Sequence, residues 1–576
     1  MKLAEALAIV QKAPGDAEEH RVMLACGFTP LHLQNYFAAH LQKALPNRKI
    51  RVLTGLYDDL PGTLAQFGES EAQACALVME WSDLDARLGY RSLGGWGTRV
   101  SSSIVQSAKE SLGRIEAMIG AIPAFSKLAI SLPTLALPPG FHTTGWQASP
   151  AELALEQAVA EFARKIAIHS PVLLVNRQRL DVISPPHLRY DFRSDLHTGF
   201  PYTMAHADAL GSALAALIEA PQPKKGLITD LDDTLWAGLV GEDGHENVSW
   251  ELAKHSQMHG LYQQMLHALA DQGVLIGIAS KNSAELAEKA LSRQDLAIAR
   301  AKIFPTEVHW EPKSGPVERI LKVWNIGADS VVFVDDNLME LEEVRAAHPG
   351  MECILFPKSD YVAGLAFLQR LRDLFGKPVI SEEDTYRLNS VRQIAPVAEV
   401  NGTGDLTERF LAAAEATITL EYNPPPTDTR VVELVNKTNQ FNLNGERYSG
   451  AEWRRVLAEP GSFALAVSYS DKFGPLGKIA VIRGKQKESR LHIETWVMSC
   501  RAFSRRIEHQ CAMQLFREFE AEELVLDFKP TPRNGPLQDF LTSLLGESPG
   551  VESRLSREDF ERKCPKLYHT VVKRNG

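Results

Sequence analysis

The chain has 576 residues, which is too long for a single hydrophobic core and suggests three or four domains. Its 44% hydrophobic and 23% charged residues are typical of a soluble globular protein, and its net charge of -10 argues against nucleic acid as a partner. The six cysteines are scattered without a CxxC pair, which argues against a disulfide framework or a zinc site and indicates a reducing compartment. No stretch suits a signal peptide or a membrane span, so we expect a cytoplasmic protein without a membrane partner.

Residues 1–220 predict a parallel α/β domain. Short apolar strands alternate with helical patterns, which is the signature of a parallel sheet covered by helices. The expected strands are 21–28, 50–56, 74–81, 128–134 and 171–175, and the last helix is 205–220. The segment PQPKK that follows is typical of a linker, and a second α/β unit is expected from there to about residue 380.

Polar side chains end three apolar strands of this second unit. Strand GLITD ends at Asp230, with Asp232 two residues on, VLIGIAS ends at Ser280, and VVFVDDN contains Asp335. Lys313, in WEPKS, stands between the last two. Because ligands bind at the carboxyl edge of a parallel sheet, we expect these side chains to meet there. Four such signals in fixed order favour a site over unrelated solvated loop residues.

These residue types suit phosphoryl transfer. One carboxylate can attack phosphorus, while the other protonates the leaving oxygen and later activates water. Ser280 can hold a phosphoryl oxygen, and Lys313 can neutralise the nucleophile and the phosphate. Asp335 supplies a hard oxygen ligand for Mg²⁺, which prefers one or two carboxylates plus substrate phosphate.

The segment resembles the haloacid dehalogenase (HAD) superfamily, whose motifs read DxD, Ser/Thr, Lys and a terminal acid pair. The resemblance implies that Asp230 is a nucleophile forming an aspartyl-phosphate and that Asp232 is the general acid/base. It also implies a Mg²⁺ ion held by Asp230, the Asp232 backbone carbonyl and Asp335. The residues expected at the phosphoryl group are Ser280, Lys313 and Asn282. The gaps between motifs are too short for a large cap, so we expect a Rossmann-like HAD domain over 221–380 whose open site suits a bulky substrate.

A polar segment around 380–410 precedes a third, mixed α/β region. Its expected strands are 416–423, 463–470, 477–484, 491–498, 523–528 and 567–572, and its helices lie near 428–437, 450–458, 503–519 and 536–545. This order is similar to that of the GNAT acyltransferases, so we expect a GNAT-like domain over 395–576. Arg501 matches the coenzyme A loop of that family, but Ser504 and Arg506 stand where glycines are expected. This departure argues against binding of the coenzyme A pyrophosphate. A carrier protein's phosphopantetheine arm has a single phosphate, so its binding would be less affected.

Six segments together resemble the FkbH-like family, which joins a HAD domain of subclass IIIC to a GNAT-like domain. They are DLDDTLWAGLVGEDG, WEPKS, FVDDN, LVNKTNQFN, MSCR and PTPRN. The resemblance implies a Mg²⁺-dependent bifunctional glyceryltransferase/phosphatase of polyketide or related metabolism. Such an enzyme dephosphorylates 1,3-bisphosphoglycerate, or a related phosphorylated three-carbon acyl donor. It loads the glyceryl group on a phosphopantetheinylated acyl carrier protein through an enzyme thioester.

Cys500, in MSCR, is the candidate acyl-accepting thiol. Arg501, Arg505 and Arg506 follow it at an expected helix N-terminus, an environment that lowers the pKa of a thiol. The alternative is a buried structural cysteine, in which case the carrier thiol attacks the donor directly. Asn439 and its neighbouring amides could bind the acyl group or pantetheine, and turn formation is their alternative role.

The N-terminal region looks like the SGNH-hydrolase-like domain of longer FkbH-like proteins, with a flavodoxin-like parallel sheet. Its first strand ends in ACGFTP, without the Gly-Asp-Ser of a working enzyme, and Asp195 and His197 do not have Asp-x-x-His spacing. Without a serine there is no serine triad. We therefore expect a non-catalytic docking or substrate-shaping module in which Cys26 and His197 are structural.

Two other functions fit the same motifs. One is a plain HAD phosphatase for a small phosphomonoester, with the GNAT-like domain used only for recognition. The other is a carrier-protein docking scaffold with a vestigial HAD site. The complete DxD, Ser, Lys and DD set argues against the scaffold, and Cys500 favours the transferase over the plain phosphatase.

Overall fold

The computed structural model describes most of the chain, which divides into two compact units. The described residues are 1–13, 17–122, 127–140, 143–169, 172–358, 360–377, 388, 391–392, 408, 411–472, 474–499, 502–503, 505–531 and 534–575. The units are Met1–Pro221 with Ser449–Ala451, and Gln222–Tyr448 with Glu452–Gly576. The central and C-terminal sheets both lie in the second unit, so the expected boundary between residues 380 and 395 stays a prediction. None of the described helices is long and apolar enough to cross a membrane.

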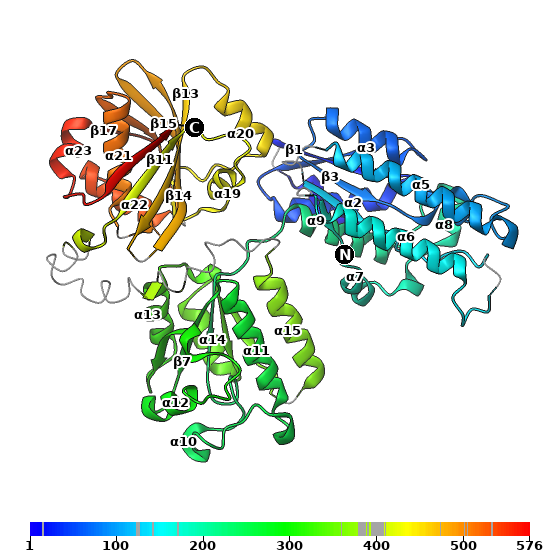
Figure 1. The fold of residues 1–576 in the computed structure, drawn as a ribbon, viewed down its shortest axis with the longest axis horizontal. Coiled ribbons are helices and arrows are strands. Elements are labelled where there is room, and N and C mark those ends of the chain that lie inside the picture. The colour runs from blue at the N-terminus through cyan, green and yellow to red at the C-terminus, as the bar shows by residue number, and fades with distance from the viewer. Residues whose placement is uncertain are drawn as a thin grey trace. The chain divides into compact units, whose positions relative to one another are not determined.

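The N-terminal unit contains the expected parallel sheet (Figure 1, blue to cyan). Its strands are β1 (Glu19–Cys26), β2 (Lys49–Thr54), β3 (Ala74–Val78), β4 (Lys127–Ser131) and β5 (Val172–Leu174). They are ordered β2-β1-β3-β4-β5 and all pairs are parallel, which is the flavodoxin-like order. The predicted parallel α/β class is therefore confirmed for this unit.

Helices cover both faces of this sheet because successive side chains of each strand point to opposite sides. Val22 and Leu24 pack with α2 (Leu31–Ala44) and α9 (Met204–Ile218). Met23 and Ala25 pack on the other face. The helices there are α3 (Leu60–Glu69), α5 (Ser101–Gly120) and α6 (Pro150–Ile166).

The central sheet is also parallel, with the order β10-β9-β6-β7-β8 (Figure 1, green). Its strands are β6 (Gly226–Thr229), β7 (Leu275–Ser280), β8 (Ile303–Val308), β9 (Val331–Asp335) and β10 (Glu352–Leu355). One face packs on α11 (Gln257–Asp271), α12 (Ala284–Leu291) and α15 (Tyr361–Phe375), the other on α13 (Ser314–Trp324) and α14 (Leu338–Ala347). The chain order reverses between β6 and β9, and a doubly wound sheet binds ligands at such a switch point.

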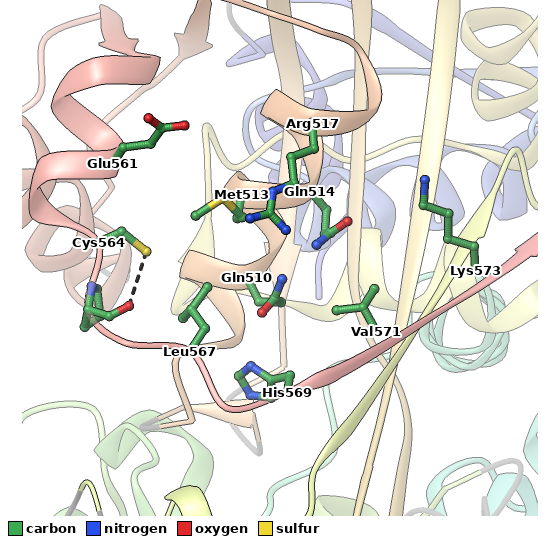
Figure 2. Close-up of a pocket in the computed structure, with 11 residues that line it drawn as sticks. Gln510, Met513, Gln514, Arg517, Glu561, Cys564, Leu567, His569, Val571 and Lys573 are labelled. Atoms are coloured by element: carbon green, nitrogen blue, oxygen red, sulfur yellow. Dashed lines mark hydrogen bonds between the residues drawn. The ribbon is translucent and has the colours of Figure 1, made fainter.

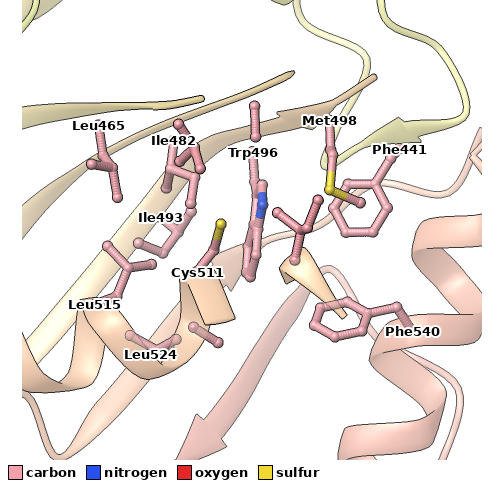
Figure 3. Close-up of a cluster of buried hydrophobic side chains, with 14 of the residues drawn as sticks. Phe441, Leu465, Ile482, Ile493, Trp496, Met498, Cys511, Leu515, Leu524 and Phe540 are labelled. Carbon is pink, nitrogen blue, oxygen red and sulfur yellow. The ribbon is translucent and has the colours of Figure 1, made fainter. Parts of the chain in front are cut away.

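The C-terminal sheet is mixed, with the order β17-β16-β15-β14-β13-β11-β18 (Figure 1, yellow to red). Its strands are β11 (Thr417–Tyr422), β12 (Phe441–Asn442), β13 (Ser462–Asp471), β14 (Gly474–Lys487), β15 (Arg490–Met498), β16 (Glu523–Asp527), β17 (Glu552–Ser556) and β18 (Thr570–Asn575). Figure 3 shows the core that the sheet forms with α21 (Ile507–Glu518) and α22 (Gly535–Leu545), around Trp496, Cys511 and Phe540. The other face packs on α19 (Thr429–Lys437) and α20 (Gly450–Leu457).

Two expectations for this region need correction. The helix expected over 503–519 begins only at Ile507, because Arg506 has a left-handed backbone with φ of 58°, which a right-handed helix does not accommodate. The expected last strand 567–572 begins at Thr570. Strand β17 and helix α23 (Arg557–Lys563) were not predicted.

Candidate active site

The sequence-predicted phosphoryl-transfer residues lie at the carboxyl edge of the central sheet. Asp230 directly follows β6, Ser280 ends β7 and Asp335 ends β9, and β6 pairs with both of the other strands. The backbone N–H of Asp230 donates to the Val334 carbonyl at 3.0 Å, which ties the two acidic strand ends together. Interaction with the Ser280 hydroxyl group lowers the pKa of the Asp230 carboxyl group, against the larger effect of burial. All three side chains are buried.

Lys313 is the central cation of the site. It stands immediately before α13, and its side chain is only 2% exposed. Its Nζ lies 3.0 Å from Asp230 Oδ1 and also forms ion pairs with Asp335 and Glu340. Burial alone would lower the pKa of Lys313, but the three carboxylates hold it above its ordinary value. The ammonium is therefore a permanent positive charge beside the candidate nucleophile.

The two strand-end carboxylates carry more negative charge than Lys313 alone balances. Burial raises the pKa of Asp230, and Lys313 opposes the shift. Burial and the charge of Asp230 raise the pKa of Asp335 to about 7, again against Lys313. Asp230 Oδ1 is buried without a well-aligned hydrogen bond from any described residue, although the Lys313 ammonium is 3.0 Å away. The carboxylates of Asp230 and Asp335 are hard oxygen ligands, and the buried Asp230 Oδ1 lacks a well-aligned hydrogen bond. Such a pair suits a divalent cation.

Glu340, in the first turn of α14, is a site residue that the sequence reasoning missed. Asp230, Asp335 and Glu340 place carboxylate oxygens within 4.8 Å of one another, a spacing that could hold a metal ion. The Lys313 ammonium already contacts all three acids. We therefore interpret the three carboxylates as a cage, meaning the set of counter-charges that surrounds the buried lysine. Lys281 also pairs with Glu340 at 3.1 Å. The sequence signal that could have found Glu340 was its position in the first turn of the helix after β9, the strand that ends at Asp335.

The Asp232 side chain is held by three donors. Its Oδ1 accepts from the Trp236 indole at 2.8 Å and from the Val240 backbone at 3.1 Å. Its Oδ2 accepts from the Asn282 amide at 2.8 Å, so Asn282, expected at the phosphoryl group, contacts the candidate acid/base instead. Burial raises the pKa of Asp232, although these hydrogen bonds oppose the shift. The carboxyl group is thus oriented, and its raised pKa favours the protonated form that a general acid needs.

A second set of charges locks the loops after β6 and β9. Lys358 pairs with Asp233 at 2.8 Å and also with Asp336. Asp233 has a left-handed backbone with φ of 51°, and its Oδ1 accepts from the Gly238 backbone at 2.9 Å. Such a turn carries the chain away from the sheet directly after Asp230 and Asp232. Only the fold brings Lys358 to these two loops.

The acyl-transfer candidates of the C-terminal region are only partly placed. Cys500 and Arg501 lie outside the described residues. Arg505 is buried 3.8 Å from Asp471, and Arg506 pairs with Glu408 at 2.8 Å. Because α21 begins at Ile507, the expected helix N-terminus does not directly follow the candidate thiol. Two of the three arginines expected beside the candidate thiol are therefore close to acidic side chains.

The amide-rich segment before β12 is used to build its own loop. Asn439 Oδ1 accepts from Arg447 at 2.6 Å, and Asn436 exchanges two hydrogen bonds with the Tyr448 backbone, at 2.8 and 2.9 Å. Asn442 donates to the Thr438 carbonyl at 3.0 Å and accepts from the Gly445 backbone at 2.8 Å. These contacts favour the turn-forming role over substrate binding for Asn439 and its neighbours.

Cys26, at the end of β1 in the N-terminal sheet, has a thiol that is buried in the core. Cys26 is buried, its Sγ donates to the Phe28 carbonyl at 3.2 Å, and burial raises its pKa. These are the properties of a structural cysteine. His197, in the last turn of α8 (Phe192–Thr198), is exposed, so it is not a packed residue. Asp195 accepts instead from the Tyr190 hydroxyl at 2.7 Å.

Comparison with known proteins gives a structural likeness that bears on this site. No family model and no curated protein matches the chain. Among solved structures, the chain is similar to a crystal structure of the N-terminal part of protein BF1531 from Bacteroides fragilis, which contains a phosphatase domain and is complexed with Mg. The TM-score is 0.52 at 18% sequence identity, over 66% of this chain and 100% of the other. At this identity the likeness shows a shared fold.

Proposed function

We propose that the central sheet carries a Mg²⁺-dependent phosphatase of the HAD type that works through a phosphorylated Asp230. The carrying observation is the arrangement of the two carboxylates of the DxD motif. Asp230 is buried against Lys313 and Ser280, whereas Asp232 is held apart by Trp236, Val240 and Asn282. The fold shared with a chain that contains a phosphatase domain complexed with Mg supports the proposal.

The chemistry follows from the positions of these groups. An Asp230 oxygen attacks phosphorus, the bond to the leaving oxygen breaks, and Asp232 gives that oxygen its proton. Asp232 then takes a proton from water, which attacks the phosphorylated aspartate and releases phosphate. Ser280 and Lys313 hold phosphoryl oxygens. A Mg²⁺ ion bound by Asp230, Asp335 and the Asp232 carbonyl would neutralise charge on the phosphoryl group.

Metal removal tests this function directly. With a panel of small phosphomonoesters, we expect phosphate release in the presence of Mg²⁺ to fall by about 100-fold or more when EDTA is added, because the excess negative charge then repels the phosphate. Added Mg²⁺ should restore the rate. Equal rates in EDTA and in Mg²⁺, measured as released phosphate, would refute the assignment.

Asn282→Ala should weaken catalysis and move its pH dependence. Loss of the hydrogen bond to Oδ2 leaves Asp232 less well oriented, so we expect kcat to fall about tenfold. The same bond lowers the pKa of Asp232, so its loss raises that pKa further, and the alkaline limb of kcat should move to higher pH. Asn247→Ala, which removes an exposed hydrogen bond to Asp243, is the control. An unchanged pH profile of kcat would contradict this role.

We further propose, on the FkbH-like resemblance, that dephosphorylation is coupled to acyl transfer. The enzyme would accept a phosphorylated three-carbon acyl donor and load its glyceryl group on the phosphopantetheine thiol of an acyl carrier protein. Cys500 would attack the acyl phosphate, displace the phosphate and hold the acyl group as a thioester. One observation favours the second candidate, a plain phosphatase. Arg505 and Arg506, which were expected to activate the Cys500 thiol, lie close to acidic side chains.

Cys500→Ser separates these two functions. For the transferase, we expect loss of carrier loading while Mg²⁺-dependent phosphate release continues, because the side chains described at the Asp230 site come from the central sheet and its helices and loops. Intact mass of enzyme and carrier protein after incubation with 1,3-bisphosphoglycerate is the measurement, and Cys353→Ser is the control. Loading at the parental rate by Cys500→Ser would show that the carrier thiol attacks the donor directly. If the parental protein loads no carrier protein, the transferase proposal is wrong and the plain phosphatase is the function that is supported.

A further inference from the structure

A cavity of about 650 Å³ lies beside α21 in the C-terminal region (Figure 2). One wall is a single stripe of that helix, Gln510, Met513, Gln514 and Arg517, which share a face because they are three, four and seven residues apart. The opposite wall is formed by β18, the last turn of α23 and the segment between them. The residues of that wall are Glu561, Cys564, Pro565, Leu567, His569, Val571 and Lys573. The volume is that of a small-molecule site.

Two buried amides face this cavity. Gln510 and Gln514 are only 4% and 6% exposed, and Figure 2 shows both side chains directed into the space between α21 and β18. Neither side chain makes a hydrogen bond to any described residue. Buried polar side chains are normally paired, and a glutamine amide offers two donors and an acceptor. These amides are therefore available to a molecule in the cavity.

The charge of the cavity is set by Arg517. Lys573 pairs with Glu518, and Glu561 pairs with Arg557 at 3.0 Å. Within the described part of the chain Arg517 has no ion-pair partner, and Figure 2 shows it extending toward Gln514. A guanidinium binds phosphate or carboxylate through two parallel hydrogen bonds.

The remaining walls are neutral. Burial lowers the pKa of His569, so its ring is uncharged, and its Nδ1 has no hydrogen-bond partner among the described residues. Met513, Leu567 and Val571 supply apolar surface. The cavity thus combines one unpaired cation, two unpaired amides and apolar walls.

We propose that this cavity is a binding site for an organic oxyanion whose chain carries amide or hydroxyl groups. The oxyanion binds Arg517, and the chain hydrogen-bonds to Gln510 and Gln514 while its carbon atoms contact Met513, Leu567 and Val571. The proposal is independent of the phosphatase, because every lining residue lies between Gln510 and Lys573, in the C-terminal region.

Cys564 provides a readout that belongs to this cavity alone. Its thiol lines the wall and is partly exposed. Maleimide labelling of Cys564 in the full-length protein is followed by peptide mass spectrometry at mildly alkaline pH, with EDTA present to stop hydrolysis. The probes are 4′-phosphopantothenate, which carries an amide beside its hydroxyl group, and 3-phosphoglycerate, which carries a hydroxyl group and no amide. The partly buried Cys353, in β10, is the internal reference.

A bound probe should slow labelling of Cys564 about tenfold at a concentration of roughly ten times its Kd and leave Cys353 unaffected. Arg517→Met and Gln514→Leu should each abolish protection, whereas Arg490→Met, an exposed arginine paired with Glu523 at 3.1 Å, should not. Protection by 4′-phosphopantothenate alone identifies an amide-bearing ligand, and protection by 3-phosphoglycerate alone a hydroxyl-bearing one. No protection by either probe, or protection that survives both cavity variants, would overturn the proposal.

Discussion

Asp230→Asn is expected to reduce Mg²⁺-dependent phosphate release by about 10⁴-fold or more, to the level of the reaction without enzyme. The amide keeps the shape of the side chain but is not a nucleophile, so no phosphorylated enzyme can form. Lys313 and Ser280 still hold the phosphoryl group, so substrate binding should be weakened less than turnover. Released phosphate measures the rate, and intact mass of the parental enzyme trapped during turnover should show one added phosphoryl group.

The control for this variant is Asp271→Asn, at the exposed end of α11, where the carboxylate pairs with Lys302. It removes the same charge outside the site and should leave the rate within about a factor of two. If Asp230→Asn retained more than a few per cent of the parental turnover, water would attack phosphorus directly. The phosphorylated-aspartate mechanism would then be wrong.

Lys313→Met is expected to combine loss of activity with the largest loss of stability. The ammonium is 2% exposed and contacts Asp230, Asp335 and Glu340, so its removal leaves three carboxylates facing one another in a buried site. Breaking a buried ion pair by removing one partner costs about 3–5 kcal/mol of unfolding free energy. Thermal unfolding in EDTA measures the loss, and Lys322→Met, an exposed lysine paired with Glu318 on the same helix, should change stability little.

The stability loss of Lys313→Met should depend on pH. Without the lysine, the pKa values of Asp230 and Asp335 rise further above their unfolded values, starting from about 7 for Asp335 in the parental protein. Groups with raised folded-state pKa values favour folding at low pH, and this contribution is lost as pH rises through the folded value. The variant should therefore be closest to the parental protein near pH 5 and furthest from it near pH 8. A deficit that is the same at both pH values would contradict the buried-charge explanation.

Much of the local architecture was predictable because it depends on neighbouring residues. Strands β6, β7 and β9 were expected from short apolar runs, and each lies within one or two residues of its predicted place. The positions of Asp230, Ser280 and Asp335 at strand ends followed from the same runs. Where a single residue's backbone decides a boundary, the prediction failed: α21 was expected from residue 503, but the left-handed Arg506 delays it to Ile507.

The sequence by itself determined that acidic and hydroxyl side chains suited to phosphoryl transfer stand at the ends of apolar strands, because strand pattern and residue chemistry are local properties. Only the tertiary structure decided which groups face each other. The order β10-β9-β6-β7-β8 places Asp230 beside Asp335, Lys313 enters from the start of α13, and Glu340 closes its cage. The same long-range packing directs Asn282 to Asp232 and pairs Arg505 and Arg506 with acids. Burial and charge pairing arise only when distant segments pack together, so no local pattern encodes them.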